Sequence, residues 1–233
     1  MDLRDRPSSN FNERPGAVDM LILHYTGMRS AAESLDRLCD PAAKVSAHYQ
    51  IDEDGTVWRL VAEEKRAWHA GVSFWRGRSD INNASIGIEL VNPGHEFGYR
   101  PFPEPQMAAL EELARGILAR HTIPPRHVLG HSDVAPLRKQ DPGELFDWPR
   151  LARAGVGFWP NFSVEKAPNP VSLAEIQSLL RQIGYSCPQT GVLDAETVAA
   201  VTAFQRHYRP KRCDGALDTE TGSRIAIVAQ GIS

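Results

Sequence analysis

The chain has 233 residues, of which 42% are hydrophobic and 24% charged, and its formal net charge at pH 7 is −3. These proportions are typical of a globular protein, and the length allows one large domain or one domain with a small module. This charge, without a stripe rich in lysine or arginine, gives no sign of a nucleic-acid partner. No apolar run is long enough to predict a membrane span, and we expect a monomer.

The N-terminal segment, residues 1–7, lacks the hydrophobic stretch of a secretory signal peptide. We therefore expect a cytoplasmic protein, and a periplasmic location is the alternative if this chain lacks an export segment. The cysteines at positions 39, 187 and 213 are too few for a disulfide scaffold. Free thiols are the expectation, with a pair between Cys187 and Cys213 in an oxidising compartment as the alternative.

Residues 1–160 predict an α/β domain, because stretches typical of strands and helices alternate along them. Ser30 and Glu33 form a capping box before a predicted helix, and Asp54-Gly55 predicts a tight turn between two strands. The expected elements are a strand at 20–25, a helix at 31–38, a hairpin at 48–61, a strand at 85–91, a helix at 105–121 and a strand starting at 128. We expect a mixed central sheet flanked by helices.

A change in composition separates this domain from the rest of the chain. Prolines mark a predicted linker at 161–170, and residues 171–233 predict a helical domain whose size is within the range that folds alone. Its first helix ends at Gly184. A short repeat, Gly191–Thr197 and Gly215–Thr221, places an aspartate at the start of each of the next two helices. We expect a three-helix domain.

The loop from Gly130 to Gly143 carries the clearest sign of chemistry. It follows a short apolar strand and holds His131, Lys139 and Asp141 among prolines and glycines, where a scaffold usually presents reactive side chains. Imidazole and carboxylate groups are both good zinc ligands, and three protein ligands with one open position are typical of catalytic zinc. The loop must fold back to bring His131 and Asp141 together.

His24, at the end of the strand 20–25, is the best candidate for the third ligand. A lone histidine there is more often structural, but beside this loop it completes a metal site. His48 is a weaker candidate, because its position early in a hairpin offers no companion ligand. We expect Asp133 to order the loop as a hydrogen-bond acceptor rather than to bind metal. Four further histidines form no such cluster and are expected at the surface: His95, His121, His127 and His207.

Glu89 is the candidate for the base that a hydrolytic zinc site needs. Apolar residues occupy one face of its strand, so Glu89 shares the other face with Gly87. A carboxylate in an apolar strand is costly without a partner, and a structural ion pair with an arginine is the alternative. Lys139 suits the stabilisation of a developing oxyanion, and a solvated loop lysine is its alternative.

Five segments, in consistent order from about residue 8 to 158, resemble the zinc-dependent N-acetylmuramoyl-L-alanine amidases of AmpD and AmiD type. They are His24–Thr26, Val45–Tyr49, Trp68–Gly71, Asn82–Glu89 and Gly130–Gly143. This family shares its fold with peptidoglycan recognition proteins. The resemblance implies that His24, His131 and Asp141 bind Zn²⁺, that Glu89 is the catalytic acid and base, and that Lys139 stabilises the transition state.

The same motifs supply candidates for substrate contacts, namely Trp68, His69 and Asn83. Aromatic and polar side chains in a glycine-punctuated loop suit sugar or peptide binding, as do those of Trp75–Arg78, although Trp68 could equally belong to the core. Some relatives have a tyrosine where this chain has Ala47, which leaves Glu89 as the only evident base.

Residues 170–229 resemble a peptidoglycan-binding module of the three-helix type, mainly at scaffold positions such as Leu179 and Phe204. Together the two resemblances imply hydrolysis of the amide between the lactyl group of N-acetylmuramic acid and L-alanine. The substrate would be peptidoglycan or a 1,6-anhydro-muropeptide, in cell-wall turnover or recycling. The alternative is a non-catalytic recognition protein, although such receptors commonly lack part of the metal triad that is present here.

Overall fold

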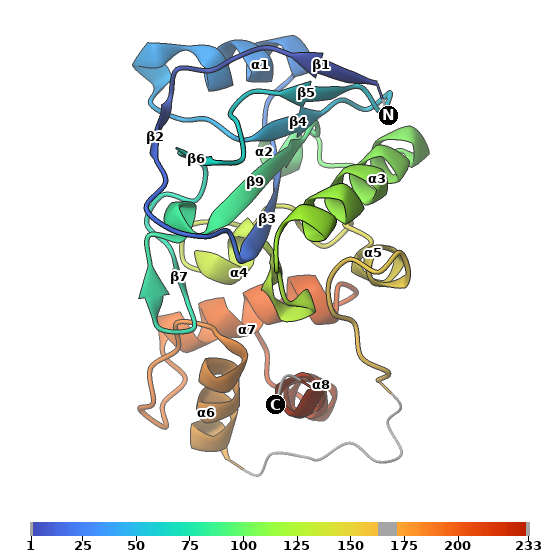
Figure 1. Ribbon diagram of the computed structural model, residues 1–233. Coiled ribbons are helices and arrows are strands. Elements are labelled where there is room, and N and C mark those ends of the chain that lie inside the picture. The colour runs from blue at the N-terminus through green and yellow to red at the C-terminus, as the bar shows by residue number, and fades with distance from the viewer. Residues whose placement is uncertain (1, 163–171, 232–233) are drawn as a thin grey trace.

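The computed structural model describes residues 2–162 and 172–231 (Figure 1). The strands are β1 (Leu3–Asp5), β2 (Phe11–Glu13), β3 (Met20–Tyr25), β4 (Tyr49–Ile51), β5 (Val57–Arg59), β6 (Lys65–Ala67), β7 (Phe74–Trp75), β8 (Arg78–Ser79), β9 (Ser85–Leu90) and β10 (Val128–Gly130). The helices are α1 (Ala31–Cys39), α2 (Gly94–Phe97), α3 (Glu104–Arg120), α4 (His131–Val134), α5 (Trp148–Arg153), α6 (Leu173–Ile183), α7 (Ala195–Tyr208) and α8 (Thr219–Gly231).

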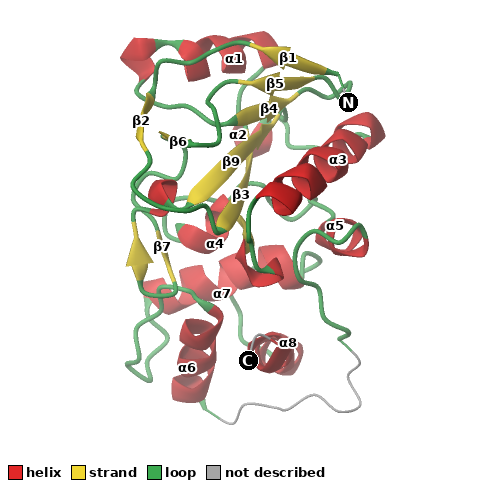
Figure 2. Ribbon diagram, in the orientation of Figure 1, coloured by secondary structure: helices red, strands yellow, loops and turns green. Residues whose placement is uncertain are grey.

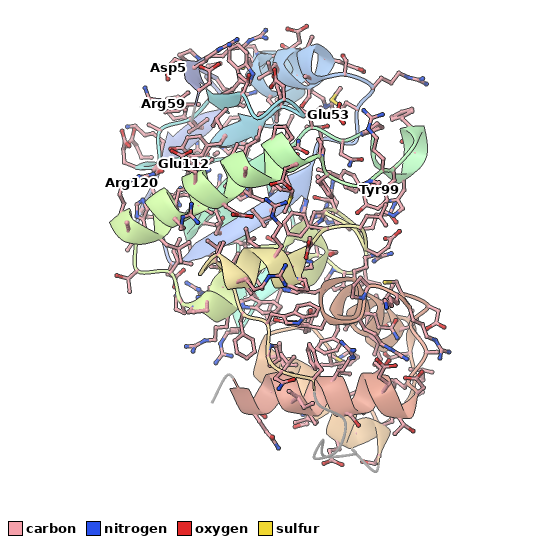
Figure 3. All side chains as sticks on the ribbon, turned by 90° about the vertical axis from the view of Figure 1, so that its right-hand side faces the viewer. Asp5, Glu53, Arg59, Tyr99, Glu112 and Arg120 are labelled. Atoms are coloured by element: carbon pink, nitrogen blue, oxygen red, sulfur yellow. The ribbon has the colours of Figure 1, made fainter. Side chains whose placement is uncertain are left out.

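Six strands form the central sheet, in the order β1-β5-β4-β9-β3-β10. The pairs β4–β9, β9–β3 and β3–β10 are parallel, whereas β4 and β5 are antiparallel, as expected for a hairpin. The predicted mixed sheet is therefore confirmed. At one edge of the sheet, β1 pairs with β5, and an ion pair between Asp5 and Arg59 joins their exposed ends (Figure 3).

One face of the sheet packs against α3, which crosses it in Figure 1. Apolar residues of β3 and β9 contact a row of α3 side chains spaced by three or four positions, the period of one helix face. The row consists of Met107, Leu110, Leu113, Ala114 and Ile117. The opposite face is divided: Met20 and Ile22 are covered by apolar side chains, and the carboxyl-terminal ends of β3 and β9 carry the polar residues of the site.

The structure confirms the predicted strands at 20–25 and 85–91 and the predicted helices within one or two residues of their expected bounds. The capping box prediction is correct in part, because the side chain of Ser30 accepts a hydrogen bond from the backbone N–H of Glu33. The sequence analysis missed β1, β2, β6 and the hairpin β7–β8. These strands have two or three residues each, too few to establish an alternating pattern.

The C-terminal part has the three predicted helices, coloured red at the base of the molecule in Figure 2. Both repeated aspartates cap their helices as expected: Asp194 accepts from the N–H of Thr197, and Asp218 from that of Thr221. Residues 163–171, which include most of the predicted linker, lie outside the described residues. The division into separate units at 1–160 and 171–233 stays a prediction.

The two parts share one hydrophobic cluster, which contains Met20, Ile22 and Leu129 of the sheet together with Leu180 and Phe204 of the helices. Trp75 lies within this cluster and is only 1% exposed. The interpretation of Trp75 as a sugar- or peptide-binding side chain is therefore wrong, because the ring is buried beneath the C-terminal helices. In the described part of the chain, every helix is too short or too polar to cross a membrane.

We expect Gly184→Ala to destabilise the protein, because the backbone there has a φ of +147° and a Cβ would lie 2.5 Å from the Trp75 ring. Strain and overpacking of this kind cost about 1–3 kcal/mol each. Gly191→Ala is the matched control, since Gly191 also has a positive φ but no atom lies near its Cβ position. Urea unfolding of both variants measures the difference, and equal stability would contradict this packing between the two parts.

Candidate active site

Strand register brings the site residues together at one edge of the sheet. In the parallel pair β3–β9, His24 lies opposite Glu89, so both side chains project from the same face near the carboxyl ends of their strands. In the pair β3–β10, Gly130 lies opposite Leu23, and the next residue, His131, begins α4. Glu89 and His131 border a cleft of about 570 Å³ that is also lined by residues of α1.

Three buried side chains meet beside this cleft, and two of them, His131 and Asp141, line it. The Nδ1 atoms of His24 and His131 are 2.9 Å apart, and each lies within 3.1 Å of Oδ2 of Asp141. All three residues are at most 5% exposed. They form the one group of at least three metal-ligating side chains found among the described residues.

The outer nitrogens of both rings have partners that determine the tautomer. Nε2 of His131 lies 3.0 Å from the carbonyl oxygen of Ala70, to which it donates. Nε2 of His24 lies 3.0 Å from Nδ1 of His69, whose own Nε2 contacts the hydroxyl of Ser85. That hydroxyl donates to the carbonyl of Ile81, so it accepts a hydrogen bond from Nε2–H of His69. Nδ1 of His69 is therefore unprotonated and accepts from Nε2–H of His24. Nδ1 of His24 and Nδ1 of His131 are therefore unprotonated, and their lone pairs point toward the space between the two rings and Asp141.

The centre thus consists of two imidazole lone pairs and a carboxylate oxygen, with no proton shared between them. Burial and, to a lesser extent, the neighbouring His131 lower the pKa of His24 to about 4, so His24 is neutral at pH 7. Three close acceptors need a cation between them, and this buried His–His–Asp group fits a metal ion.

The loop from Gly130 to Gly143 folds back on itself, as expected, and brings Asp141 beside His131. The N–H of Ser132 donates to the carbonyl of Asp141 at 2.9 Å, and a side chain at Gly130 would strike the ring of Pro142. Tyr99, labelled in Figure 3, holds the far side: its hydroxyl donates to the carbonyl of Pro142 and accepts from the N–H of Leu145. The position of Asp141 is therefore set from two directions.

Glu89 borders the cleft beside this group. Its Oε2 is buried and has no hydrogen-bond partner among the described residues, so the alternative of a structural ion pair is not supported. Burial raises the pKa of Glu89 well above its ordinary value, and Asp141 adds to the increase while Lys139 opposes it. A carboxyl group with a raised pKa in a cleft is suited to both accept and donate a proton.

Lys139 lines the same cleft and is partly exposed. Its backbone N–H donates to the carbonyl of Ala135, which holds the residue near Asp141 while its ammonium group stays close enough to Glu89 to affect the pKa of that carboxyl. It is one of three cationic residues that border the cleft, with Arg37 and Arg138. The sequence analysis did not single out the two arginines, because neither belongs to a metal- or base-like pattern.

The three candidates for substrate contacts are placed differently from one another. His69 borders the cleft but is buried and supports His24, a role that the sequence analysis did not foresee. Trp68 and Asn83 lie outside the cleft lining: the Trp68 indole donates to Asn12, and the Asn83 amide donates to Asp80. Their contact with substrate stays a prediction.

Several other histidines are buried rather than exposed. His48 is not part of the metal-binding group, because its Nδ1 accepts from the N–H of Gly87 and its Nε2 contacts the carbonyl of Lys65. The expectation of a surface position is wrong for His127 and His207, which are 7% and 3% exposed. Asp133 is an acceptor as expected, and His207 is one of its donors.

Comparisons with known proteins agree with this geometry. Residues 14–144 match the family described as "N-acetylmuramoyl-L-alanine amidase", and residues 171–225 match the family described as "Putative peptidoglycan binding domain". The N-acetylmuramoyl-L-alanine amidase AmiD of Escherichia coli is 38% identical over 223 residues, which cover 88% of this chain and 79% of AmiD. The 1,6-anhydro-N-acetylmuramyl-L-alanine amidase AmpD of Haemophilus influenzae is 34% identical over 64% of this chain and 90% of AmpD.

Solved structures show the same similarity. A complex of E. coli AmiD with anhydro-N-acetylmuramic acid-L-Ala-D-gamma-Glu-L-Lys superposes with a TM-score of 0.81 at 34% identity, over 94% of this chain and 92% of that one. AMPDH3 from Pseudomonas aeruginosa has a TM-score of 0.81 at 37% identity, over 93% of this chain and 94% of that one.

Fold and site together define an amide hydrolase with a centre fit for a metal ion. The chain belongs to the N-acetylmuramoyl-L-alanine amidase family. The predicted family, fold class and enzymatic activity are confirmed, and membership favours the enzyme over the alternative of a non-catalytic recognition protein. The cytoplasmic location and monomeric state stay predictions.

We expect Glu89→Gln to make the metal-free protein more stable at pH 8, by about 1–3 kcal/mol, the usual cost of a buried group without a partner. Because the pKa of Glu89 is raised on folding, the folded state binds more protons than the unfolded chain. Stability therefore falls as the pH rises above about 4.3, the ordinary pKa of glutamate, and the glutamine variant lacks this fall. Urea unfolding in the presence of a chelator measures the difference at pH 8 and at pH 4, where it should vanish.

The control is Glu64→Gln, at an exposed carboxylate, for which we expect little change at either pH. A wild-type protein as stable as the Glu89→Gln variant at pH 8 would contradict the burial of an unpartnered carboxylate at this position.

Proposed function

We propose that the cleft hydrolyses the amide bond between the lactyl group of N-acetylmuramic acid and L-alanine, with Zn²⁺ held by His24, His131 and Asp141. The observation that carries this proposal is the close approach of three acceptor atoms, within 3.1 Å of one another, next to a carboxyl group with a raised pKa. Two imidazole nitrogens and one carboxylate oxygen match the ligand types of catalytic zinc.

When bound, zinc supplies a Lewis acid that polarises a carbonyl group and acidifies water. Glu89 takes a proton from the water that attacks the lactyl carbonyl carbon. As the C–N bond breaks, the same carboxyl returns that proton to the nitrogen of L-alanine, which leaves as an amine. Burial of Glu89 supports both steps, since a raised pKa makes its carboxylate a better base at neutral pH.

Lys139 stabilises the negative charge that develops on the carbonyl oxygen during this attack. Its place in the cleft lining, which it shares with Glu89, and its favourable electrostatic effect on the charged form of that carboxyl support this role. Asp141, two residues after Lys139, has its Oδ2 atom beside the Nδ1 atoms of His24 and His131.

The proposed substrates are peptidoglycan and soluble 1,6-anhydro-muropeptides. The ligand in the AmiD complex contains a glutamate residue, and the cationic side chains of Arg37, Arg138 and Lys139 along the cleft suit carboxylates of such a peptide. The match of residues 171–225 to a peptidoglycan-binding family supports action on the polymer as well. We assign residues 1–160 to catalysis and 171–233 to wall binding.

We expect Glu89→Ala to lower kcat on a soluble anhydro-muropeptide by at least about 10²-fold, the usual contribution of a general acid and base, while zinc remains bound. His24→Ala should instead lose the metal, because it removes one of three ligands. Release of free stem peptide and metal content per chain measure the two effects. Turnover at the wild-type rate in the Glu89→Ala variant would refute the role of Glu89, and full zinc content in the His24→Ala variant would refute the ligand assignment.

A further inference from the structure

A buried carboxylate connects the C-terminal helices to the loop that carries His131. Asp133 is 1% exposed and lies in α4, two residues after His131. Its Oδ2 accepts from the backbone N–H of Gly130 at 2.8 Å and from Nδ1–H of His207 at 2.8 Å, and its Oδ1 accepts from the hydroxyl of Tyr185 at 2.6 Å. Two of its three donors therefore come from the C-terminal part of the chain.

The contact with Gly130 links Asp133 to the metal-binding group. Gly130 is the residue at which β10 ends and α4 begins, and His131 is the first helical residue after it. A side chain that accepts from the N–H of the cap residue fixes the start of a helix. The direction in which His131 leaves the sheet thus depends on where the Asp133 carboxylate is held.

A second contact, through Trp148, links the C-terminal helices to Gly130. The His207 ring, on α7, stacks on Trp148 with centroids 3.7 Å apart and planes 15° from parallel. Trp148 itself lies against Gly130, since a Cβ there would be 3.4 Å from its ring. Figure 1 shows α7 directly beneath α4, which agrees with these contacts.

Tyr185 is equally well fixed. It is 1% exposed, its ring packs edge-on against Trp75 at a centroid distance of 5.0 Å, and its backbone N–H donates to the carbonyl of Leu180 at the end of α6. A hydroxyl held in this way reaches Asp133 from one direction only. The C-terminal helices therefore present two preorganised donors to the loop, rather than a mobile surface.

We propose that Tyr185 and His207 are positioning residues of the metal site, which act through Asp133 and Gly130 on the ligand His131. This inference rests on the proposed role of His131 as a zinc ligand. It assigns the C-terminal helices a function in catalysis that is separate from binding the wall, so it applies equally to small soluble substrates. The partners that orient metal ligands usually affect metal affinity by about 10–100-fold.

The test is the dissociation constant for zinc of the full chain, measured by competition with a chelator, together with kcat on a soluble muropeptide. Tyr185→Phe removes the hydroxyl and should weaken zinc binding by about tenfold, with a fall in kcat. The matched control is Tyr208→Phe, in the same cluster, because no hydrogen bond from Tyr208 to Asp133 is found among the described residues. It should bind zinc within about twofold of wild type.

A second pair of variants separates the hydrogen bond from packing. His207→Leu and His207→Asn introduce side chains with the same number and branching of heavy atoms, and both lose the stacked ring, but only asparagine keeps an N–H donor close to the place of Nδ1. We expect weakened zinc binding with leucine and recovery with asparagine. If Tyr185→Phe fails to fold, this pair decides the question alone.

Zinc affinity unchanged in Tyr185→Phe and His207→Leu, even with lower thermal stability, would overturn the inference, since the contacts would then only join the two parts. This outcome differs from failure of the proposed function, in which the wild-type chain itself would neither bind zinc nor release stem peptide.

Discussion

The structure depends on one electrostatic constraint: three acceptor atoms, Nδ1 of His24, Nδ1 of His131 and Oδ2 of Asp141, lie within 3.1 Å of one another in a buried place. Without a cation this arrangement is repulsive, and it persists only because the surroundings hold each group. Ala70 and His69 orient the two rings, and the backbone contact between Ser132 and Asp141 folds the loop back. A site preorganised in this way has its ligands in place before the metal arrives.

The parallel sheet explains why the reacting groups are neighbours. The register between β3 and β9 places Glu89 opposite His24, and the register between β3 and β10 places His131 next to both. Three strands that are far apart in sequence thus bring His24, Glu89 and His131, the proposed base and two proposed ligands, to one end of the sheet. On the same face of β3, toward the start of the strand, Met20 and Ile22 belong to the apolar cluster that the C-terminal helices cover. The loop from Gly130 to Gly143 therefore carries residues of the site and also packs against the C-terminal helices.

The main strands and helices and the residues of the candidate site could be predicted from the sequence, because each stands in a distinctive local pattern. The strand around His24, the loop with its ligand types and the carboxylate in an apolar strand each stand out by residue type and spacing. The supporting contacts could not be predicted, since they join distant residues: Tyr185 and His207 lie 52 and 74 positions from Asp133. The sequence predicts a substrate contact for His69, because a histidine in a glycine-rich loop has no pattern that separates support of a neighbouring side chain from contact with substrate. The burial of Trp75 could not be predicted either, because the side chains that cover it lie on the C-terminal helices, far along the chain.

The most direct test of the account is a zinc titration of the chelator-treated full chain, followed by calorimetry and by the thermal unfolding midpoint. The account predicts saturation at one zinc per chain and a midpoint that rises with zinc concentration, because an ion that binds only the folded state stabilises it. Replacement of His131 by alanine should remove both effects. Absence of saturable binding, or an unfolding midpoint that zinc does not change, would contradict the claim that the three acceptors form a metal site.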